Sequence, residues 1–94
     1  MADYKFDGKE LRDRRGDRVG EFDGRYIRNR RGDRIGEIDR EYLRDKSGNR
    51  VAEFDGRDVR DSGGSRIATI DDVRKAVDGI GGASLVAMWF FFIR

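Results

Sequence analysis

Residues 22–37 read F-D-G-R-Y-I-R-N-R-R-G-D-R-I-G-E, and close copies of this stretch follow one another along the chain. Four such units of 16 residues begin at Phe6, Phe22, Ile38 and Phe54. A repeat this short cannot bury its apolar side alone, so its copies are expected to pack against one another. The repeat therefore governs the fold of residues 6–69, and the C-terminal stretch needs a separate account.

Each unit carries apolar residues at three fixed positions. The first holds Phe6, Phe22, Ile38 and Phe54, the second Leu11, Ile27, Leu43 and Val59, and the third Val19, Ile35, Val51 and Ile67. Their successive spacings of five, eight and three residues do not make the stripe of a helix, and β-branched and aromatic residues favour strands. We therefore expect two short strands in each unit, and about eight antiparallel strands in all.

Two turn motifs alternate between these strands. Asp-Gly, at Asp7, Asp23 and Asp55, predicts a type I′ turn with positive φ at both central residues. The third unit has Asp39-Arg40 there, so its turn is expected to differ. The second motif is Asp or Asn followed three residues later by Gly, which indicates a type I turn with a glycine bulge. The glycines expected to be left-handed are Gly16, Gly32, Gly48 and Gly64.

A flat ladder cannot bury all three apolar positions of a unit. If Phe22 pairs with Arg25 across the turn, Phe22 and Ile27 share one face and Val19 lies on the other. Each unit is therefore expected to bend or to contain a bulge. The close approach that such a bend needs is expected at the small residue after the third apolar position. These small residues are Gly20, Gly36, Ala52 and Ala68.

A closed ring of four units is a better interpretation than a straight solenoid. No unit has the polar character of a cap, Ile70 restarts the repeat, and closure removes exposed strand edges. The pattern F-D-G-x-x-[LIV]-R-[DN]-x-x-G-x-R-[VI]-[GA]-E resembles the small β-flower proteins of the four-fold kind, in which consecutive hairpins are arranged like petals. The resemblance covers residues 6–70. It implies a fold and transfers no site residues.

After Thr69 the pattern breaks, which divides the chain into a repeat domain of residues 1–70 and a tail of residues 71–94. The start of the tail is expected to form a short helix capped by Asp71 or Asp72. A joint containing Gly79, Gly81 and Gly82 follows. Residues 83–93 are uncharged and apolar all round, which predicts a buried helix about 16 Å long.

The apolar part of the tail has three interpretations, which the sequence leaves open. It fills the centre of its own ring, it joins copies into an oligomer or fibre, or it associates with a membrane. A spanning helix needs about 20 apolar residues, so this run is too short to cross a bilayer. Its aromatic residues also suit the strands of a fibre. The residues concerned are Leu85, Val86, Met88, Trp89, Phe90, Phe91, Phe92 and Ile93.

Charged residues make up 43% of the chain, yet 21 Lys plus Arg against 19 Asp plus Glu leave a net charge of only +2. Such an even balance between basic and acidic residues argues against a nucleic-acid partner. The chain has no His and no Cys, so the commonest general base and disulfides are excluded. The Asp-x-x-Gly-Asp stretch at 13–17 lacks the alternating oxygen ligands of a calcium loop. We expect no enzyme activity, no cofactor and no metal.

Arginines are the most regular polar feature of the repeat. In a closed ring, one set would form a circle able to bind an anion, because guanidinium groups match phosphate or carboxylate oxygens bidentately. The preferred alternative is that these arginines pair with the equally regular acidic residues of the surface. The set is Arg12, Arg28, Arg44 and Arg60. Tyr26 and Tyr42 are either a ligand platform or, more simply, cross-strand packing residues.

Taken together, these patterns predict a mainly β protein: four 16-residue β-hairpin repeats in a closed pseudo-four-fold ring, with an apolar C-terminal helix. Its expected function is that of a non-catalytic structural or protein-interaction module, with self-assembly through the apolar tail left open. The alternatives are a small membrane-associated protein with the ring as a soluble head, and an anion binder. The N-terminus has no apolar signal region, so a cytoplasmic location is the default expectation.

Overall fold

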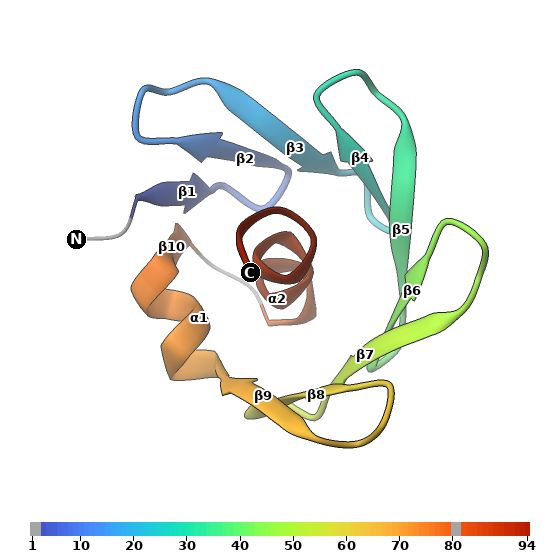
Figure 1. The fold of residues 1–94 in the computed structure, drawn as a ribbon. Coiled ribbons are helices and arrows are strands. Elements are labelled where there is room, and N and C mark those ends of the chain that lie inside the picture. Colours follow the sequence, from blue (N-terminus) through green and yellow to red (C-terminus); the bar gives the residue numbers. More distant parts are fainter. Residues whose placement is uncertain (1–2, 80–81) are drawn as a thin grey trace.

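Ten strands and three helical segments make up the protein in a computed structural model, which describes residues 3–79 and 82–94 (Figure 1). The strands are β1 (Tyr4–Phe6), β2 (Glu10–Asp13), β3 (Arg18–Phe22), β4 (Tyr26–Asn29), β5 (Arg34–Asp39), β6 (Tyr42–Asp45), β7 (Arg50–Phe54), β8 (Asp58–Asp61), β9 (Arg66–Thr69) and β10 (Val77–Gly79). The helical segments are α1 (Ile70–Ala76), α2 (Ala83–Met88) and the π-helical turn η1 (Trp89–Ile93). The predicted mainly β class is confirmed.

All ten strands belong to one sheet, in the order β10-β1-β2-β3-β4-β5-β6-β7-β8-β9. Neighbouring strands are antiparallel except β1 and β10, which run parallel with Lys5 opposite Asp78. The sheet curls around α2 and η1, and the turns that join β2–β3, β4–β5, β6–β7 and β8–β9 point away from this centre (Figure 1). We number these four hairpins one to four in chain order.

The expected closure of the sheet into a ring is wrong. In the part of the chain that the structure describes, β9 and β10 are the two edges of the sheet and do not pair with each other. Helix α1 connects them and fills the place between them (Figure 1). The physical reason is a capping box. Thr69 Oγ1 accepts a hydrogen bond from the N–H of Asp72, and Asp72 Oδ2 accepts one from the N–H of Thr69, so a helix starts where the repeat restarts.

Thr69 is therefore the N-cap of α1, and not Asp71 or Asp72 as predicted. The two aspartates lie in the first turn, where negative charge stabilises a helix. Of the predicted glycine joint, Gly79 ends β10 and Gly82 precedes α2, while Gly81 lies outside the described residues.

The turns that connect successive hairpins are not of type I′. Phe22 pairs with Ile27 and not with Arg25, and the N–H of Asp23 donates to the carbonyl of Tyr26 at 3.2 Å. Two central residues, Gly24 and Arg25, remain between them. Only Gly24 of these two has a positive φ, of 105°, which is the pattern of a type II′ turn. Asp23 causes the difference, because its Oδ1 accepts hydrogen bonds from the next two N–H groups beyond Gly24 and so keeps the aspartate outside the central pair.

The third connecting turn differs from the others, as predicted. Arg40 occupies the glycine position with φ of 59°, and among residues 3–79 and 82–94 it is the one non-glycine residue with positive φ. A side chain in this conformation crowds the backbone, which costs about 1–2 kcal/mol.

Arg40→Gly is therefore expected to raise the free energy of unfolding by about 1 kcal/mol, since glycine removes the crowding but brings a larger backbone entropy to the unfolded chain. Gly24→Ala at the equivalent position is expected to lower it by a similar amount. Urea unfolding followed by circular dichroism measures both variants. A loss of stability in Arg40→Gly would contradict the assignment of strain to this residue.

The turns at the outer ends of the hairpins are the predicted type I turns with a glycine bulge. We call them tip turns; they comprise residues 13–17, 29–33, 45–49 and 61–65. Their glycines have φ of 88° or 89°. In the first, the N–H of Gly16 donates to the carbonyl of Asp13 at 3.0 Å, and Asp13 Oδ1 accepts from Arg15 N and Asp17 N.

Each hairpin contains the predicted bulge. In hairpin one Leu11 pairs with Gly20, but Arg12 pairs with Arg18, so Val19 is the extra residue. The same shift recurs in the other three hairpins. The bulge lets Leu11 and Gly20 face the core, while Val19 is left half-buried at the side.

The core lies where the sheet surrounds residues 83–94, which we call the central segment. Its residues Leu85, Val86, Ala87 and Met88 are fully buried. The second apolar residue of every unit is fully buried in the same cluster; these are Leu11, Ile27, Leu43 and Val59. The central segment thus forms the inner part of the core, and the strands surround it.

The central segment is α-helical only as far as Met88, and not over the whole of residues 83–93 as predicted. Beyond it the chain winds as a π-helix, in which Arg94 N donates to Trp89 O at 2.8 Å. This end packs on two strand glycines. A Cβ atom at Gly20 would overlap the ring of Phe92, and one at Gly36 would overlap the ring of Phe91. The close approach predicted at these glycines is confirmed.

Candidate functional site

The four arginines of the predicted anion ring lie in four different hairpins. Each donates from Nη1 to the carbonyl oxygen of the glycine in its own tip turn, at 2.9–3.3 Å. Each also forms an ion pair within its unit. The pairs are Arg12–Glu10, Arg28–Asp23 at 3.2 Å, Arg44–Asp39 at 3.1 Å and Arg60–Asp58 at 3.5 Å. These guanidinium groups are occupied inside the hairpins.

A second set of arginines, at the start of β3, β5, β7 and β9, covers one residue of the preceding strand. That residue is acidic in hairpins one and four, where the ion pairs are Arg18–Glu10 at 3.7 Å and Arg66–Asp58 at 3.8 Å. It is tyrosine in the other two, where Arg34 lies 4.5 Å from the ring centroid of Tyr26 and Arg50 lies 3.9 Å from that of Tyr42. The tyrosines therefore make the cross-strand packing that was the simpler of their two predicted roles.

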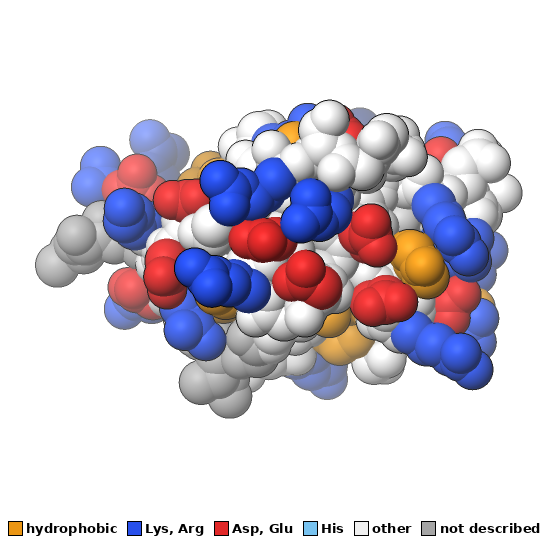
Figure 2. All heavy atoms as spheres, turned by 90° about the horizontal axis from the view of Figure 1, so that it is seen from below, with side chains coloured by type: hydrophobic (Ala, Val, Ile, Leu, Met, Phe, Trp, Pro, Cys, Tyr) orange, Lys and Arg blue, Asp and Glu red, His pale blue; other side chains and the backbone are white. Residues whose placement is uncertain are grey.

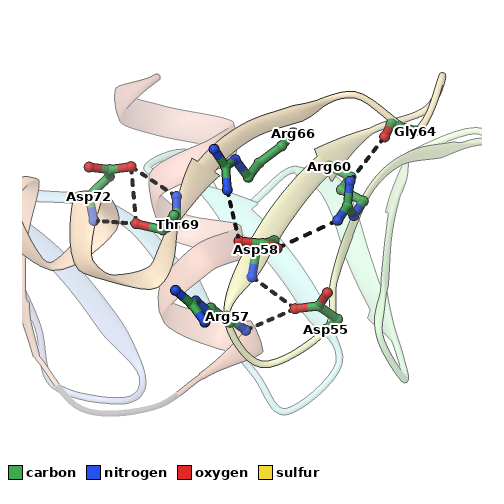
Figure 3. A network of polar contacts seen from close by, with 8 residues as sticks. All are labelled: Asp55, Arg57, Asp58, Arg60, Gly64, Arg66, Thr69 and Asp72. Carbon is green, nitrogen blue, oxygen red and sulfur yellow. Dashed lines mark hydrogen bonds and ion pairs between the residues drawn. The ribbon is translucent and has the colours of Figure 1, made fainter.

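Asp58 lies between Arg60 and Arg66 (Figure 3). Its own N–H donates to Asp55 Oδ1 at 2.8 Å, which joins the connecting turn to this network. Asp58 Oδ1 is buried without a hydrogen bond from any described residue, since Arg66 Nη1 at 3.8 Å is too distant to donate one. Partly exposed pairs of this kind contribute about 0–1 kcal/mol each to stability. The role that fits this network is to fix the hairpin, and nothing in it indicates a catalytic site.

The turn carboxylates are held in the ionised state by backbone N–H groups. A hydrogen bond from the N–H of Tyr26 is the largest cause of a lowered pKa at Asp23, and one from the N–H of Asn49 lowers the pKa of Asp45. A general acid or base at neutral pH needs a pKa moved the other way. These carboxylates are therefore suited to fixing turns and not to proton transfer.

Asp45→Asn tests this role. Asn29 stands at the equivalent place in hairpin two and accepts the same pair of backbone hydrogen bonds, at 2.9 and 3.0 Å. The variant should therefore be about as stable as the parent at pH 7. Because the pKa of Asp45 is lower in the folded than in the unfolded protein, its contribution is present above the unfolded value of 3.8 and is lost as pH falls through the folded value.

Melting temperatures at pH 7 and at several values below about pH 4 measure this effect. The variant is expected to lose less stability in acid than the parent does. Equal acid dependence of the two proteins would show that Asp45 does not gain its turn hydrogen bonds as a carboxylate.

Surface hollows lie between neighbouring hairpins. One of about 160 Å³ has Tyr42 and Arg50 on one side and Asp61 on the other, and one of about 180 Å³ is its equivalent between hairpins two and three. Both are smaller than the range of about 300–1,000 Å³ usual for small-molecule sites. A third, of about 370 Å³, is lined by residues between Asp3 and Gly16 and by Asp78 of β10, and it has three basic and three acidic side chains.

Exposed charged residues lie on the tip turns. The two central residues of each tip turn take part in its hydrogen bonds only through their backbone, so their side chains are free to differ. They are Arg14-Arg15, Arg30-Arg31, Lys46-Ser47 and Ser62-Gly63. Pairs of arginines therefore occupy the centres of the first two tips, of which the first also contains Asp13 and Asp17. The paired arginines of the first two tips are not found by looking for positions that all four units share. They are found by looking for positions at which the units differ.

The side of the molecule nearest β8, β9 and α1 looks different. Figure 2 shows Lys and Arg side chains interleaved there with Asp and Glu side chains, and apolar atoms only in small separate patches. An interleaved surface of this kind has little net field.

No protein-family model, curated protein or solved structure matches the chain. Within residues 3–79 and 82–94, no group of three or more acidic side chains is placed to hold a metal ion. No helix in those same ranges has the length and apolarity needed to cross a membrane. The function is therefore argued from the geometry of this chain alone.

Proposed function

We propose that this protein is a non-catalytic interaction module, built as four hairpins arranged like the petals of a four-fold β-flower around a helix from its own tail. The burial of the central segment carries this proposal. Leu85, Val86 and Met88 have 0% exposure inside their own chain, so they already serve as a core. Using them to join copies or to enter lipid would require the fold to open and to lose that burial.

The part of the central segment that stays accessible is its end. Trp89 to Ile93, the residues of η1, are each half-buried. Self-assembly or association with a membrane would have to use these residues, which makes both of them alternatives to a monomeric module. Binding of an anion by Arg12 and its equivalents has less support, because their guanidinium groups are engaged with glycine carbonyls and carboxylates in separate hairpins.

Light scattering without detergent tests the proposal, using the full chain beside a version that ends at Gly82. We expect the full chain to be a folded monomer near 10.8 kDa and the shorter version to be unfolded. A large full chain together with a shorter version that is a folded monomer would overturn the proposal, because the tail would then serve to join copies. Sedimentation of the full chain with liposomes would favour the membrane alternative.

A further inference from the structure

The excess positive charge of this protein is confined to one sector. Residues 22–37 hold five arginines and three acidic residues, so the 21 basic and 19 acidic residues of the chain leave 16 of each sign elsewhere. Within this unit Asn29 replaces the aspartate that begins the other three tip turns. The tip of hairpin two is thereby the least compensated of the four.

Hairpins one and two are also joined to each other. Arg18 Nη2, on the first residue of β3, donates to the carbonyl oxygen of Arg30 at 3.5 Å, so this side chain reaches from hairpin one to the tip of hairpin two. We call Arg18 and the exposed arginines of the two tip turns the basic rim. They are Arg14, Arg15, Arg18, Arg30 and Arg31.

Three of the five arginines of the basic rim have no ion pair among the described residues, although Asp13, Asp17 and Asp33 lie in the same two tips, and Arg18 pairs with Glu10 at 3.7 Å. Arg15, Arg30 and Arg31 form no ion pair with any described carboxylate, and Arg14 pairs only with Asp3, at 3.3 Å, with both side chains mostly exposed. By contrast, Arg12 and its equivalents in the hairpin shafts are engaged with carbonyl and carboxylate oxygens. Other exposed arginines without an ion pair to a described carboxylate, such as Arg57 and Arg74, are spread singly over the described surface, whereas Arg15, Arg30 and Arg31 belong to two successive tips.

We propose that the basic rim is a docking surface for an acidic segment of a partner protein. This inference rests on the proposed function as an interaction module and names the chemistry of the partner. Guanidinium groups bind carboxylates bidentately, and several of them on two successive tips match a row of Asp or Glu side chains. The two tip turns contain no aromatic residue, and Tyr4, which lines a hollow with Arg14 and Arg15, offers a single ring, so stacking of successive bases has little support and a polypeptide is favoured over single-stranded nucleic acid.

A variant with Arg15→Ser, Arg30→Ser and Arg31→Ser tests the rim. Serine already occupies central tip positions in hairpins three and four, so these changes are expected to leave the turns and the melting temperature intact. The matched control is Arg57→Ser, Arg74→Ser and Lys75→Ser. It removes the same charge from exposed residues on the side of β8 and α1.

Fluorescence anisotropy of a labelled oligo-glutamate peptide gives the readout, at low salt and again at physiological salt. We expect the rim variant to bind at least about tenfold more weakly than the parent, and the control to change less than about twofold. Binding should also weaken as salt screens the exposed charges. Equal losses in the two variants would overturn the inference, because net charge alone would then decide binding. Absence of binding by the parent at low salt would overturn it too.

A single-stranded oligonucleotide of equal charge serves as the competing probe. Tighter binding of the parent to the oligonucleotide than to the oligo-glutamate would overturn the choice of an acidic polypeptide. Failure of the proposed function has a separate readout, because light scattering would then show an oligomer irrespective of how the peptide binds. If the parent is a monomer but the rim variant and the control bind the oligo-glutamate peptide equally, this inference alone is contradicted.

Discussion

Leu85→Asp is expected to unfold the protein. The side chain of Leu85 has no exposure to solvent and packs in one apolar cluster with the strand residues. A carboxylate placed there would lack a compensating partner, which costs several kcal/mol in addition to the lost packing. A small domain is stable by only about 5–15 kcal/mol in total. Circular dichroism at 25 °C should show loss of the β signal.

Two further variants calibrate this result. Leu85→Ala introduces a cavity and no charge, and is expected to lower the free energy of unfolding by about 2–5 kcal/mol. Ser84→Asp places the same carboxylate one residue earlier, where the side chain is partly exposed at the start of α2, and is expected to change stability by less than about 1 kcal/mol. A folded Leu85→Asp with an unchanged melting temperature would show that the central segment does not lie in the core in solution.

Gly36→Ala is expected to lower the free energy of unfolding by about 1–3 kcal/mol, through overpacking. The added Cβ would overlap the ring of Phe91 and lie 2.9 Å from the carbonyl oxygen of Arg44, a backbone atom that cannot move aside alone. Gly20→Ala is expected to cost less, because the three atoms nearest to its Cβ all belong to the ring of Phe92, which is the far end of a side chain. Thermal and urea unfolding of the two variants rank them.

Double variants show whether the aromatic rings are the cause. In a Phe92→Leu background, Gly20→Ala is expected to cost much less, because the three atoms nearest to the new Cβ all belong to that ring. In a Phe91→Leu background, part of the cost of Gly36→Ala is expected to remain, because the carbonyl oxygen of Arg44 is still in place. Strict additivity in both cycles would contradict direct contact between these residues.

The local structure of the hairpins was predictable because it depends on residues close in sequence. A glycine three residues after Asp or Asn was enough to place Gly16 and its equivalents in the left-handed region. The conflict between Val19 and the other apolar positions was enough to predict a bulge. The connecting turns were predicted wrongly because the Asp-Gly pair alone does not reveal that Asp23 Oδ1 takes two backbone N–H groups and shifts the central pair by one residue.

The closure of the sheet could not be predicted from the repeat. At Ile70 the apolar pattern restarts as if another strand followed, but Thr69 and Asp72 form a capping box that starts a helix. The capping box appears in the sequence as T-x-x-D, whereas the usual capping-box pattern is Ser or Thr followed three residues later by Glu or Gln. The apolar pattern of the repeat is the stronger signal at this point, and it predicts a strand. The position of the central segment also could not be settled, because an apolar run indicates burial and does not name what buries it.

The candidate docking surface illustrates a different difficulty. Arg12 and its equivalents are conspicuous in the sequence because they recur, yet recurrence in this chain marks residues that hold the hairpins together. The tip residues Arg30 and Arg31 recur only in part, and the turn does not need their side chains. The docking surface proposed above therefore depends on departures from the repeat and not on its shared positions.

The order of the core residues along the chain bears on how the protein is made. Leu11, Ile27, Leu43 and Val59 all leave the ribosome before Leu85 and Met88, the residues that they enclose. A nascent chain that has reached only Val77 can form its hairpins from local contacts but has nothing to pack inside them. Such a chain exposes the inner face of its sheet, which is the surface that chaperones and aggregation partners recognise. Folding is therefore expected to be completed only after synthesis of the central segment.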